Sequence, residues 1–511
     1  MSYKKTIFTG TLILTLSGFL SRILGFYNRI FLSNLIGAKE LGIYQLIFPV
    51  YMLFFTLVCH GFETGISNLI SRFSITGQKR NMKQLIHCTC VIAFFLSLIL
   101  SFILLCCSDN VSQYILKEAS TAPALKISSL ALPFVALKSC LHGYYIGMNR
   151  SSVPAASQLI EQITRVSSIY LLSLTLYATT ADATIAVWGM VCGEMVSSIY
   201  TIFAYLYTTR IKKNRLLPIS HPKRQKEHIL PLSVLLKDFF SFSIPLTINH
   251  FSLTIVNSFE NMLIPFMLIR SCSDQTTALE IYGTLTGMAL PFLFFPATIV
   301  NSLSVMLLPA ISSSFKQKKM IQIQSTISKS IHYCVVIGIF STFAFLIYGN
   351  ALGEIIFHST QAGHYVYQFA ILCPFMYVSQ TISSILNGFG NTRQTLYHNL
   401  IGVGIRIAFI LTTIPSLGIA GYLYGLLAGY GVQIILNLLY IFRITSFPFS
   451  VEKTLLLPSA LALAGSWGSR QLYQFLFIHY SFHPILMLAM SGIAYFLFFT
   501  ASQIVMEQLS T

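Results

Sequence analysis

The chain of 511 residues is 55% hydrophobic and only 9% charged, whereas a soluble domain carries about 25% charged residues. This composition excludes a water-soluble globular protein. Apolar stretches of roughly 20 residues, the length that crosses a bilayer as a helix, recur along the whole sequence. We therefore expect an all-α, polytopic membrane protein, because a segment in hydrocarbon must satisfy its backbone groups internally and no series of short alternating strands suggests a barrel.

The basic residues are distributed between loops in a way that predicts the topology. The formal net charge is +17, but the Lys and Arg residues do not gather on one soluble face with interleaved aromatic residues, as a nucleic-acid-binding surface requires. Counted from a cytoplasmic N-terminus, the loops on the inner side hold about twenty Lys and Arg residues, as the positive-inside rule expects. The outer loops hold only Lys39, Lys117, Arg270 and Arg470. We expect a cell-membrane protein with both termini in the cytoplasm and no nucleic acid partner.

In chain order, the apolar stretches predict about fourteen spans. They lie near residues 6–33, 42–70, 85–107, 124–147, 153–178, 184–207, 238–269, 281–308, 327–349, 364–388, 396–415, 418–442, 454–475 and 484–506. The one long polar insert separates six spans from eight. It predicts an N-terminal six-helix lobe (1–207), a basic cytoplasmic linker (208–236), a second six-helix lobe (237–445) and two additional helices (446–511).

The two lobes carry matching residues at matching places. Three features of the fourth and fifth spans recur in the tenth and eleventh at one constant offset: Pro133 and Pro374, Gly147 and Gly388, Arg165 and Arg406. Because each unit has an even number of spans, the two repeats run in the same orientation, about an axis along the membrane normal. Such parallel repeats are typical of transporters whose lobes rock about a central cavity.

Charged side chains inside the first two spans are candidates for that cavity. A charge within a span costs at least about 2.5 kcal/mol, so it faces a partner or a cavity. Arg22 and Arg29 lie seven residues apart on one face of the first span. Arg22 either pairs with Glu63 in the second span or binds an anion. Arg29 lies near the outer interface, where snorkelling to headgroups is the alternative to a cavity role.

The later spans add further charges. Lys138 either snorkels outward or faces the cavity. Glu161 and Arg165 lie four residues apart on one helix, so they either neutralise each other as a structural pair or line the cavity. Glu194 lies in the sixth span, and the second lobe has fewer intramembrane polar groups, with Glu260, His250 and Arg406 the obvious ones.

These positions define the candidate site. The candidate substrate-binding residues are Arg22, Arg29, Lys138, Arg165 and Arg406, and the candidate coupling-ion or charge-pair residues are Glu63, Glu161 and Glu260. Nucleotide-binding, hydrolase and metalloprotease motifs are absent from the sequence, and the ten cysteines lack the spacing of a zinc site. We therefore expect a protein that is not an enzyme, with no catalytic residue, no cofactor and no metal.

Four segments of the sequence carry a family resemblance. Residues 21–30 read SRILGFYNRI, residues 41–45 read LGIYQ, and residues 282–291 read YGTLTGMALP; a shorter match follows at Asn387-Gly388 and Gly390-Asn391-Thr392. Together they resemble the stage V sporulation protein B branch of the polysaccharide exporters. This branch is part of the multidrug, oligosaccharidyl-lipid and polysaccharide (MOP) exporter superfamily, close to the MurJ-type flippases of lipid II.

The resemblance implies a fold, a substrate and a site. It implies two six-helix lobes plus two terminal helices, and a cationic cavity that takes the pyrophosphate and sugar head of a lipid-linked glycan. The last two helices would form the groove for the lipid tail. Of the family's cavity arginines only Arg22 carries over; the second falls on Asn28, a third is replaced near 51–55, and the second-lobe arginine would fall near Thr286.

The leading hypothesis is therefore a flippase that moves a lipid II-like peptidoglycan precursor across the cytoplasmic membrane by alternating access, for spore-cortex or cell-wall synthesis. Its partners would be the lipid-linked glycan, membrane lipids and cell-wall enzymes. The alternatives are a multidrug or cation antiporter, a flippase of another polysaccharide intermediate, and a non-transporting scaffold for cell-wall enzymes. A scaffold has no need for buried charge, and an antiporter is expected to centre on acidic cavity residues.

Overall fold

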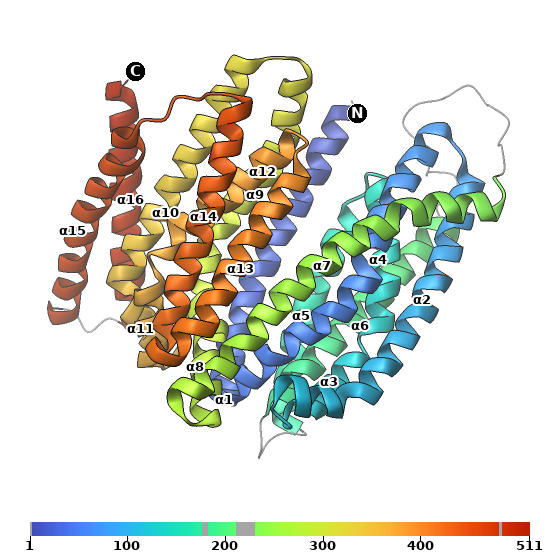
Figure 1. The fold of residues 1–511 in the computed structure, drawn as a ribbon, viewed down its shortest axis with the longest axis horizontal. Coiled ribbons are helices and arrows are strands. Elements are labelled where there is room, and N and C mark those ends of the chain that lie inside the picture. The colour runs from blue at the N-terminus through green and yellow to red at the C-terminus, as the bar shows by residue number, and fades with distance from the viewer. Residues whose placement is uncertain (1–2, 176–181, 211–229, 480–482, 511) are drawn as a thin grey trace. The chain divides into compact units, whose positions relative to one another are not determined.

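The computed structural model describes residues 3–175, 182–210, 230–479 and 483–510 (Figure 1). Over these residues the regular secondary structure is entirely helical, which confirms the all-α class expected from composition. Packing divides the chain into two compact units, residues 1–262 and 263–511. Of the predicted linker, residues 211–229 lie outside the described part of the chain.

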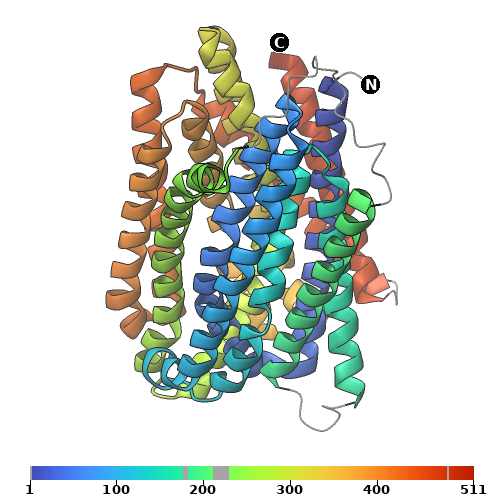
Figure 2. The same cartoon turned by 90° about the vertical axis from the view of Figure 1, so that its right-hand side faces the viewer.

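The described residues of the first unit form seven α-helices. They are α1 (Tyr3–Thr76), α2 (Lys79–Asn110), α3 (Thr121–Ser129), α4 (Leu132–Gly147), α5 (Ser152–Thr175), α6 (Ala183–Arg210) and α7 (Leu232–Cys272), whose last residues enter the second unit. A π-helical turn, Val111–Leu116, follows α2. Figure 2 shows these helices, coloured blue to green, running alongside one another.

The second unit contains the remaining α-helices of the described chain, which range from nine to 38 residues. They are α8 (Gln275–Gly283), α9 (Leu290–Lys316), α10 (Met320–Phe357), α11 (Thr360–Phe369), α12 (Leu372–Gly388), α13 (Thr392–Leu417), α14 (Ile419–Ile444), α15 (Leu457–His479) and α16 (Pro484–Ser510). Asp274 caps α8 by accepting the Thr277 backbone N–H at 2.9 Å. Hydrogen bonds from Thr276 and Thr277 hold the pKa of this exposed carboxyl well below its usual value.

Each predicted span falls on helix, apart from the end of 153–178, which reaches into undescribed residues. By length and composition, nine helices of the described chain can cross a membrane, or eleven if each bent pair is one span. The predicted number of fourteen is therefore not confirmed. One reason is α1, which counts once although it covers two predicted spans. Its break is at Gly37, with φ 78° and ψ 176°, a backbone conformation that favours glycine.

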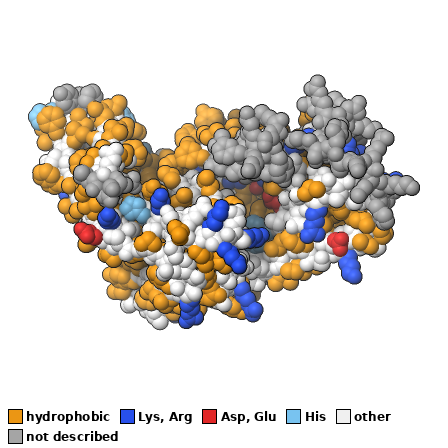
Figure 3. All heavy atoms as spheres, turned by 90° about the horizontal axis from the view of Figure 1, so that it is seen from above, with side chains coloured by type: hydrophobic (Ala, Val, Ile, Leu, Met, Phe, Trp, Pro, Cys, Tyr) orange, Lys and Arg blue, Asp and Glu red, His pale blue; other side chains and the backbone are white. Residues whose placement is uncertain are grey.

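The helix surfaces fit a bilayer. Large apolar side chains point outward along whole helices, for example Phe95 (60% exposed) and Phe102 (68%) on α2 and Phe203 (68%) on α6. A monomeric soluble protein rarely exposes such continuous apolar surface. Figure 3 shows orange apolar side chains and blue Lys and Arg side chains on one face of the molecule. The chain is a multi-pass membrane protein.

The two units repeat one helix pattern. α2, α4 and α6 in the first unit correspond to α10, α12 and α14 in the second, and the contacts α2 to α4, α4 to α6 and α5 to α6 recur as α10 to α12, α12 to α14 and α13 to α14. The bent pair α3 and α4 (43°) matches α11 and α12 (54°). Residues with positive φ also recur, each pair 241 positions apart: Gly77 and Lys318, Lys117 and His358, Asn149 and Gly390.

Glycines make matching close contacts in both repeats. A Cβ atom built on Gly147 of α4 would lie 2.7 Å from the Ser67 carbonyl oxygen and 2.9 Å from Ile70 Cβ of α1. A Cβ atom on Gly388 of α12 would lie 3.2 Å from the Leu308 carbonyl oxygen and 3.0 Å from Ile311 Cβ of α9. Small residues at helix crossings let backbones approach closely, which is a main source of packing energy in membranes.

The first helix of the predicted second lobe packs within the first unit. α7 lies along the C-terminal half of α1, where the Thr56 and Thr254 hydroxyls are 3.2 Å apart. Ser258 donates a hydrogen bond of 2.9 Å to the carbonyl oxygen of Pro49. Gly61 and Gly65 of α1 allow this approach, since a Cβ atom on Gly61 would lie 2.8 Å from the Ser243 carbonyl oxygen.

Replacing Gly147 by Leu should destabilise the folded protein by about 1–3 kcal/mol or more, because the added side chain has no room against α1. The matched control is Gly404→Leu, since Gly404 lies in α13 with nothing within 4 Å of a built Cβ atom. Thermal unfolding of the detergent-purified proteins should show a lower midpoint for the first variant only. Equal midpoints for the two variants would contradict the role given to this contact.

Candidate functional site

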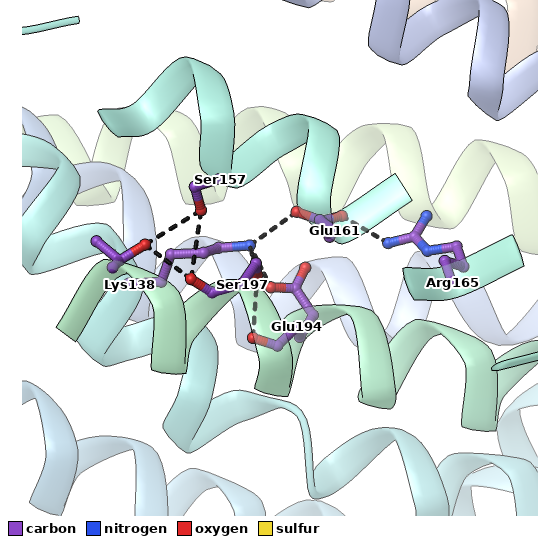
Figure 4. Close-up of polar contacts among 7 residues, drawn as sticks. Lys138, Ser157, Glu161, Arg165, Glu194 and Ser197 are labelled. Atoms are coloured by element: carbon purple, nitrogen blue, oxygen red, sulfur yellow. Dashed lines mark hydrogen bonds and ion pairs between the residues drawn. The ribbon is translucent and has the colours of Figure 1, made fainter. Parts of the chain in front are cut away.

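A buried ion cluster joins three helices of the first unit (Figure 4). Lys138 Nζ, on α4, donates to Glu161 Oε2 on α5 at 2.8 Å and also contacts the Glu194 carboxylate on α6. Lys138 is 8% exposed and Glu194 6%. Lys138 is thus neutralised inside the bundle and does not reach outward to the membrane surface.

Glu161 binds a second cation with its other oxygen. Arg165 Nη2 donates to Glu161 Oε1 at 2.7 Å, the pair that the four-residue spacing on α5 predicts. With all four groups ionised, the two cations and two carboxylates have no net charge. Neutralisation offsets the cost of burying each charge, whereas a single missing member leaves an uncompensated charge in a low-dielectric interior.

A layer of hydroxyl groups extends the cluster along α5 and α6 (Figure 4). Thr201 Oγ1 donates to the Ser197 carbonyl at 2.8 Å and to Ser157 Oγ at 3.1 Å, and Ser157 donates to the Ser197 carbonyl at 3.4 Å. Lys138 Nζ lies 3.5 Å from Ser197 Oγ. The face of α5 that holds Ser157, Glu161 and Arg165 therefore meets a polar face of α6.

Glycines on α6 bring these polar faces together. A Cβ atom on Gly193 would lie 2.9 Å from the Glu161 carbonyl oxygen and 3.4 Å from Arg165 Cβ. A Cβ atom on Gly189 would lie 2.8 Å from Ile169 Cδ1 and 3.1 Å from the Arg165 carbonyl oxygen. Without side chains at these two positions, α6 approaches α5 closely enough for Glu194 and Glu161 to share Lys138.

The two arginines of α1 differ from Lys138 and Arg165 in having no counter-ion. Arg22 is exposed and Arg29 is half-buried, and neither pairs with a carboxylate among the described residues. In particular, Arg22 does not form the ion pair with Glu63 that the sequence offered as one alternative. The charge of Arg165 and the phenol of Tyr44 lie within electrostatic range of Arg29. Arg29 of α1 and Arg165 of α5, both cationic, therefore lie near each other.

Several buried polar atoms between α1 and α5 have no hydrogen-bond partner among the described residues. They include Asn28 Oδ1, Tyr51 Oη, Gln162 Oε1 and Arg165 Nε. Gln162 Oε1 would lie 3.7 Å from a Cβ atom on Gly25, which places α5 against the Arg22–Arg29 segment of α1. Buried polar atoms are ordinarily satisfied, so these four have hydrogen-bonding capacity that no described residue uses.

Glu63 lies on the other half of α1, at a pocket of about 450 Å³ lined by Glu63, Thr64, Ser67, Asn68, Ser71, Arg72 and Ile146. Its carboxylate forms no hydrogen bond or ion pair with any described residue. Lys138 lies within electrostatic range of Glu63, but its ion pairs are with Glu161 and Glu194.

In the second unit, Arg406 occupies the position that repeats Arg165. It is 7% exposed, lies over the Tyr430 ring at 5.3 Å, and packs against Gly429 of α14. The remaining predicted polar groups lie on α7. Glu260 is buried, and the His250 ring stacks on His60 of α1 with centroids 4.8 Å apart.

Sequence reasoning identified most of the charged groups but not their arrangement. Glu194 was recognised as intramembrane without a partner, and Ser157, Ser197 and Thr201 were not singled out. A signal was present, because Glu194, Ser197 and Thr201 fall at helical spacing on one face of α6. Asn28, Tyr51 and Gln162 carry no comparable sequence signal, since only burial distinguishes them.

Comparison with known proteins identifies one matching family and several similar proteins. Residues 7–315 match the family described as polysaccharide biosynthesis protein. The chain is 26% identical to stage V sporulation protein B of Bacillus subtilis (strain 168) over 471 residues, covering 90% of this chain and 88% of that protein. It is 21% identical to the lipid II flippase MurJ of the same organism, covering 89% and 86%.

Solved structures share the fold. A lipid II flippase MurJ in an inward closed conformation superposes with a TM-score of 0.64 at 16% identity, covering 98% of this chain and 100% of that one. An inward-facing multidrug resistance MATE family transporter of the MOP superfamily gives a TM-score of 0.63 at 15% identity, covering 83% and 94%. The chain therefore has the same fold as these two solved structures.

Replacing Lys138 by Met should cost about 3–5 kcal/mol of stability, because it leaves Glu161 and Glu194 buried together without their shared cation. The control is Lys126→Met. Lys126 pairs with Asp109 at the same 2.8 Å, but these side chains are 44% and 57% exposed, so about 0–1 kcal/mol is expected.

Thermal unfolding in detergent measures both variants. Adding Glu194→Gln to Lys138→Met removes one carboxylate and should recover part of the lost stability. If the Lys138 and Lys126 variants unfold at the same temperature, the buried cluster does not contribute the stability predicted for it.

Proposed function

This chain belongs to the polysaccharide biosynthesis protein family, and we propose that it is a flippase for a lipid-linked glycan. The proposed substrate is a peptidoglycan precursor like lipid II, moved from the inner to the outer leaflet for spore-cortex or cell-wall synthesis. Supporting it are the similarity to stage V sporulation protein B over 90% of the chain and the similarity to MurJ. We place the protein itself in the cell membrane, with both of its termini in the cytoplasm.

The observation that carries this proposal is the division of the intramembrane cations into two kinds. Lys138 and Arg165 are held by carboxylates, whereas Arg22 and Arg29 are not ion-paired in the described chain. A cation within an apolar span that has no fixed counter-ion is suited to an anionic ligand. A pyrophosphate group supplies that charge, and planar guanidinium groups bind phosphate oxygens with paired hydrogen bonds.

In the proposed mechanism, the two lobes alternate access to a central cavity. The head of the precursor enters from the cytoplasm, its pyrophosphate binds Arg22 and Arg29, and the lobes rock to release it outside. The ion cluster around Glu161 keeps α4, α5 and α6 together so that the first lobe moves as one body. Arg165 adds to the positive potential near Arg29, and Arg406 has a packing position against Tyr430 and Gly429.

The lipid tail would remain in the membrane beside the last two helices. α15 and α16 pack against each other and against α10, where Tyr495 stacks on Phe340 at 4.7 Å. α16 exposes large apolar side chains, including Ile493, Phe496 and Leu497. Such a surface suits a polyprenyl chain, which needs apolar contact and no hydrogen bonds.

A coupling ion would bind at a carboxylate, and Glu63, Glu161 and Glu260 are the candidates. Glu63 is the one among them without an assigned partner in the described chain. The runner-up function, a multidrug or cation antiporter, is supported by the shared fold with the MATE family transporter. The presence of unpaired arginines favours an anionic substrate over a cationic drug.

Two vesicle assays separate these functions. Purified protein is reconstituted into proteoliposomes, and outward display of labelled lipid II is compared with efflux of a cationic dye. The flippase proposal predicts protein-dependent lipid II display and no dye transport. Dye transport without lipid II display would support the antiporter instead, and neither activity would favour a non-transporting scaffold.

Within that assay, Arg22→Ala should lower the rate of lipid II display at least tenfold, because it removes a phosphate-binding cation. Arg22→Lys should keep part of the rate, since the charge remains without the paired donors. The control is Arg443→Ala, an exposed arginine at the end of α14, which should transport normally. Wild-type rates for Arg22→Ala at equal protein levels would remove Arg22 from the site.

A further inference from the structure

The groove between the C-terminal half of α1 and α4 has a composition that the fold does not require. Its polar groups are Glu63, Thr64, Ser67, Asn68, Ser71 and Arg72, and Ile146 of α4 forms an apolar wall. They occur at helical spacing, so they form one continuous stripe on α1. The pocket volume of about 450 Å³ falls within the usual range for small-molecule sites, roughly 300–1,000 Å³.

These polar groups are available to a ligand. Thr64 donates to the His60 carbonyl oxygen at 2.6 Å. The side chains of Glu63, Ser67, Asn68 and Ser71 form no hydrogen bond with described residues. They combine a carboxylate acceptor, an amide that both donates and accepts, and hydroxyl groups that do either.

The corresponding helix crossing in the second repeat, between α9 and α12, provides a comparison for the residues of this groove. Gly147 packs against Ser67 and Ile70 as Gly388 packs against Leu308 and Ile311, so the two grooves have the same backbone contacts. At the same offset of 241 residues, the counterparts of Glu63, Ser67 and Asn68 are Ser304, Leu308 and Pro309. Leu308 and Pro309 show that the helix crossing tolerates apolar residues at two of these positions, while Ser304, Ser312 and Ser313 keep hydroxyl groups. The carboxylate of Glu63, the amide of Asn68 and the guanidinium of Arg72 are therefore particular to the first repeat.

The chemistry of the groove selects the ligand class. A phosphate group is disfavoured, because the Glu63 carboxylate would repel it and Arg72 is the one cation in the lining. A metal centre with several protein ligands, unlike a coupling ion at a single carboxylate, is disfavoured, because the described residues contain no group of three or more His, Cys, Asp or Glu side chains placed to hold one. A neutral molecule with several hydroxyl or amide groups fits both the donors and the acceptors.

We propose that this groove, which we call the Glu63 groove, binds a sugar ring of the lipid-linked glycan. This proposal rests on the proposed flippase function and assigns the sugar to a place separate from Arg22 and Arg29. Glu63 accepts hydrogen bonds from ring hydroxyls, Asn68 and the serines complete the polar contacts, and Ile146 contacts the apolar face of the ring. The pyrophosphate and the sugar are then recognised by different residues.

The test compares two ligands that differ in the sugar. Binding of lipid II and of undecaprenyl pyrophosphate, which carries no sugar, is measured for the full-length protein in nanodiscs. Ser67→Ala/Asn68→Ala and Glu63→Ala should each weaken lipid II binding about tenfold, the loss of one or two hydrogen bonds. Undecaprenyl pyrophosphate should bind these variants as it binds the wild type.

Two controls keep the outcomes separate. Arg22→Ala should weaken both ligands, and Ser312→Ala, the counterpart of Ser71 in the second repeat, should weaken neither. Ser71→Ala is a milder version of the test that leaves the α1–α4 contact untouched if the other variants fold poorly. Equal loss of both ligands, or no loss of either, in the groove variants would overturn the sugar site. Wild-type protein that binds neither ligand would instead contradict the flippase function.

Discussion

The first unit depends on one electrostatic constraint, that charge buried inside a membrane helix bundle must be neutralised where it lies. Glu161 meets it by binding Lys138 with one oxygen and Arg165 with the other, while Glu194 provides the second contact for Lys138. Three helices therefore have to stay in register, because sliding any one of them would separate buried charges in a low-dielectric medium. Arg22 and Arg29 on α1 are outside this arrangement and form no ion pair with a described residue.

The cluster is possible because the backbones come unusually close. Gly193 places α6 on the Glu161 carbonyl, and Gly429 makes the same contact with Gly402 and Arg406 in the second unit. In the second unit, however, the arginine lies over Tyr430 and no carboxylate occupies the place of Glu161, where the sequence has Gly402. One backbone arrangement thus supports an ion cluster in one repeat and a cation–π contact in the other.

Much of the fold could be predicted from the sequence, because hydrocarbon imposes simple rules. Within the described residues each predicted span falls on helix, and the constant offset between Pro133, Gly147 and Arg165 and their counterparts recurs in the positive-φ turns. The number of spans stays unconfirmed, since α1 joins two helices across the break at Gly37 and the pairs α3 with α4 and α11 with α12 are bent. The Glu161–Arg165 pair follows from helical spacing. The Lys138 contacts do not, because they join residues 23 and 56 positions apart, on helices whose relative rotation is set by glycine packing.

The repeat offers a way to separate structure from function within one chain. Where both repeats keep a residue, as at Gly147 and Gly388, the helix crossing explains it. Where only one repeat keeps a polar group, packing cannot be the reason, because the other repeat forms the same crossing without it. The carboxylate of Glu161 and the polar side chains of Ser67 and Asn68 belong to the first repeat alone, since their counterparts are Gly402, Leu308 and Pro309. A transporter built from two similar lobes can therefore use one of them mainly for recognition, while the other supplies a matching body that moves with it.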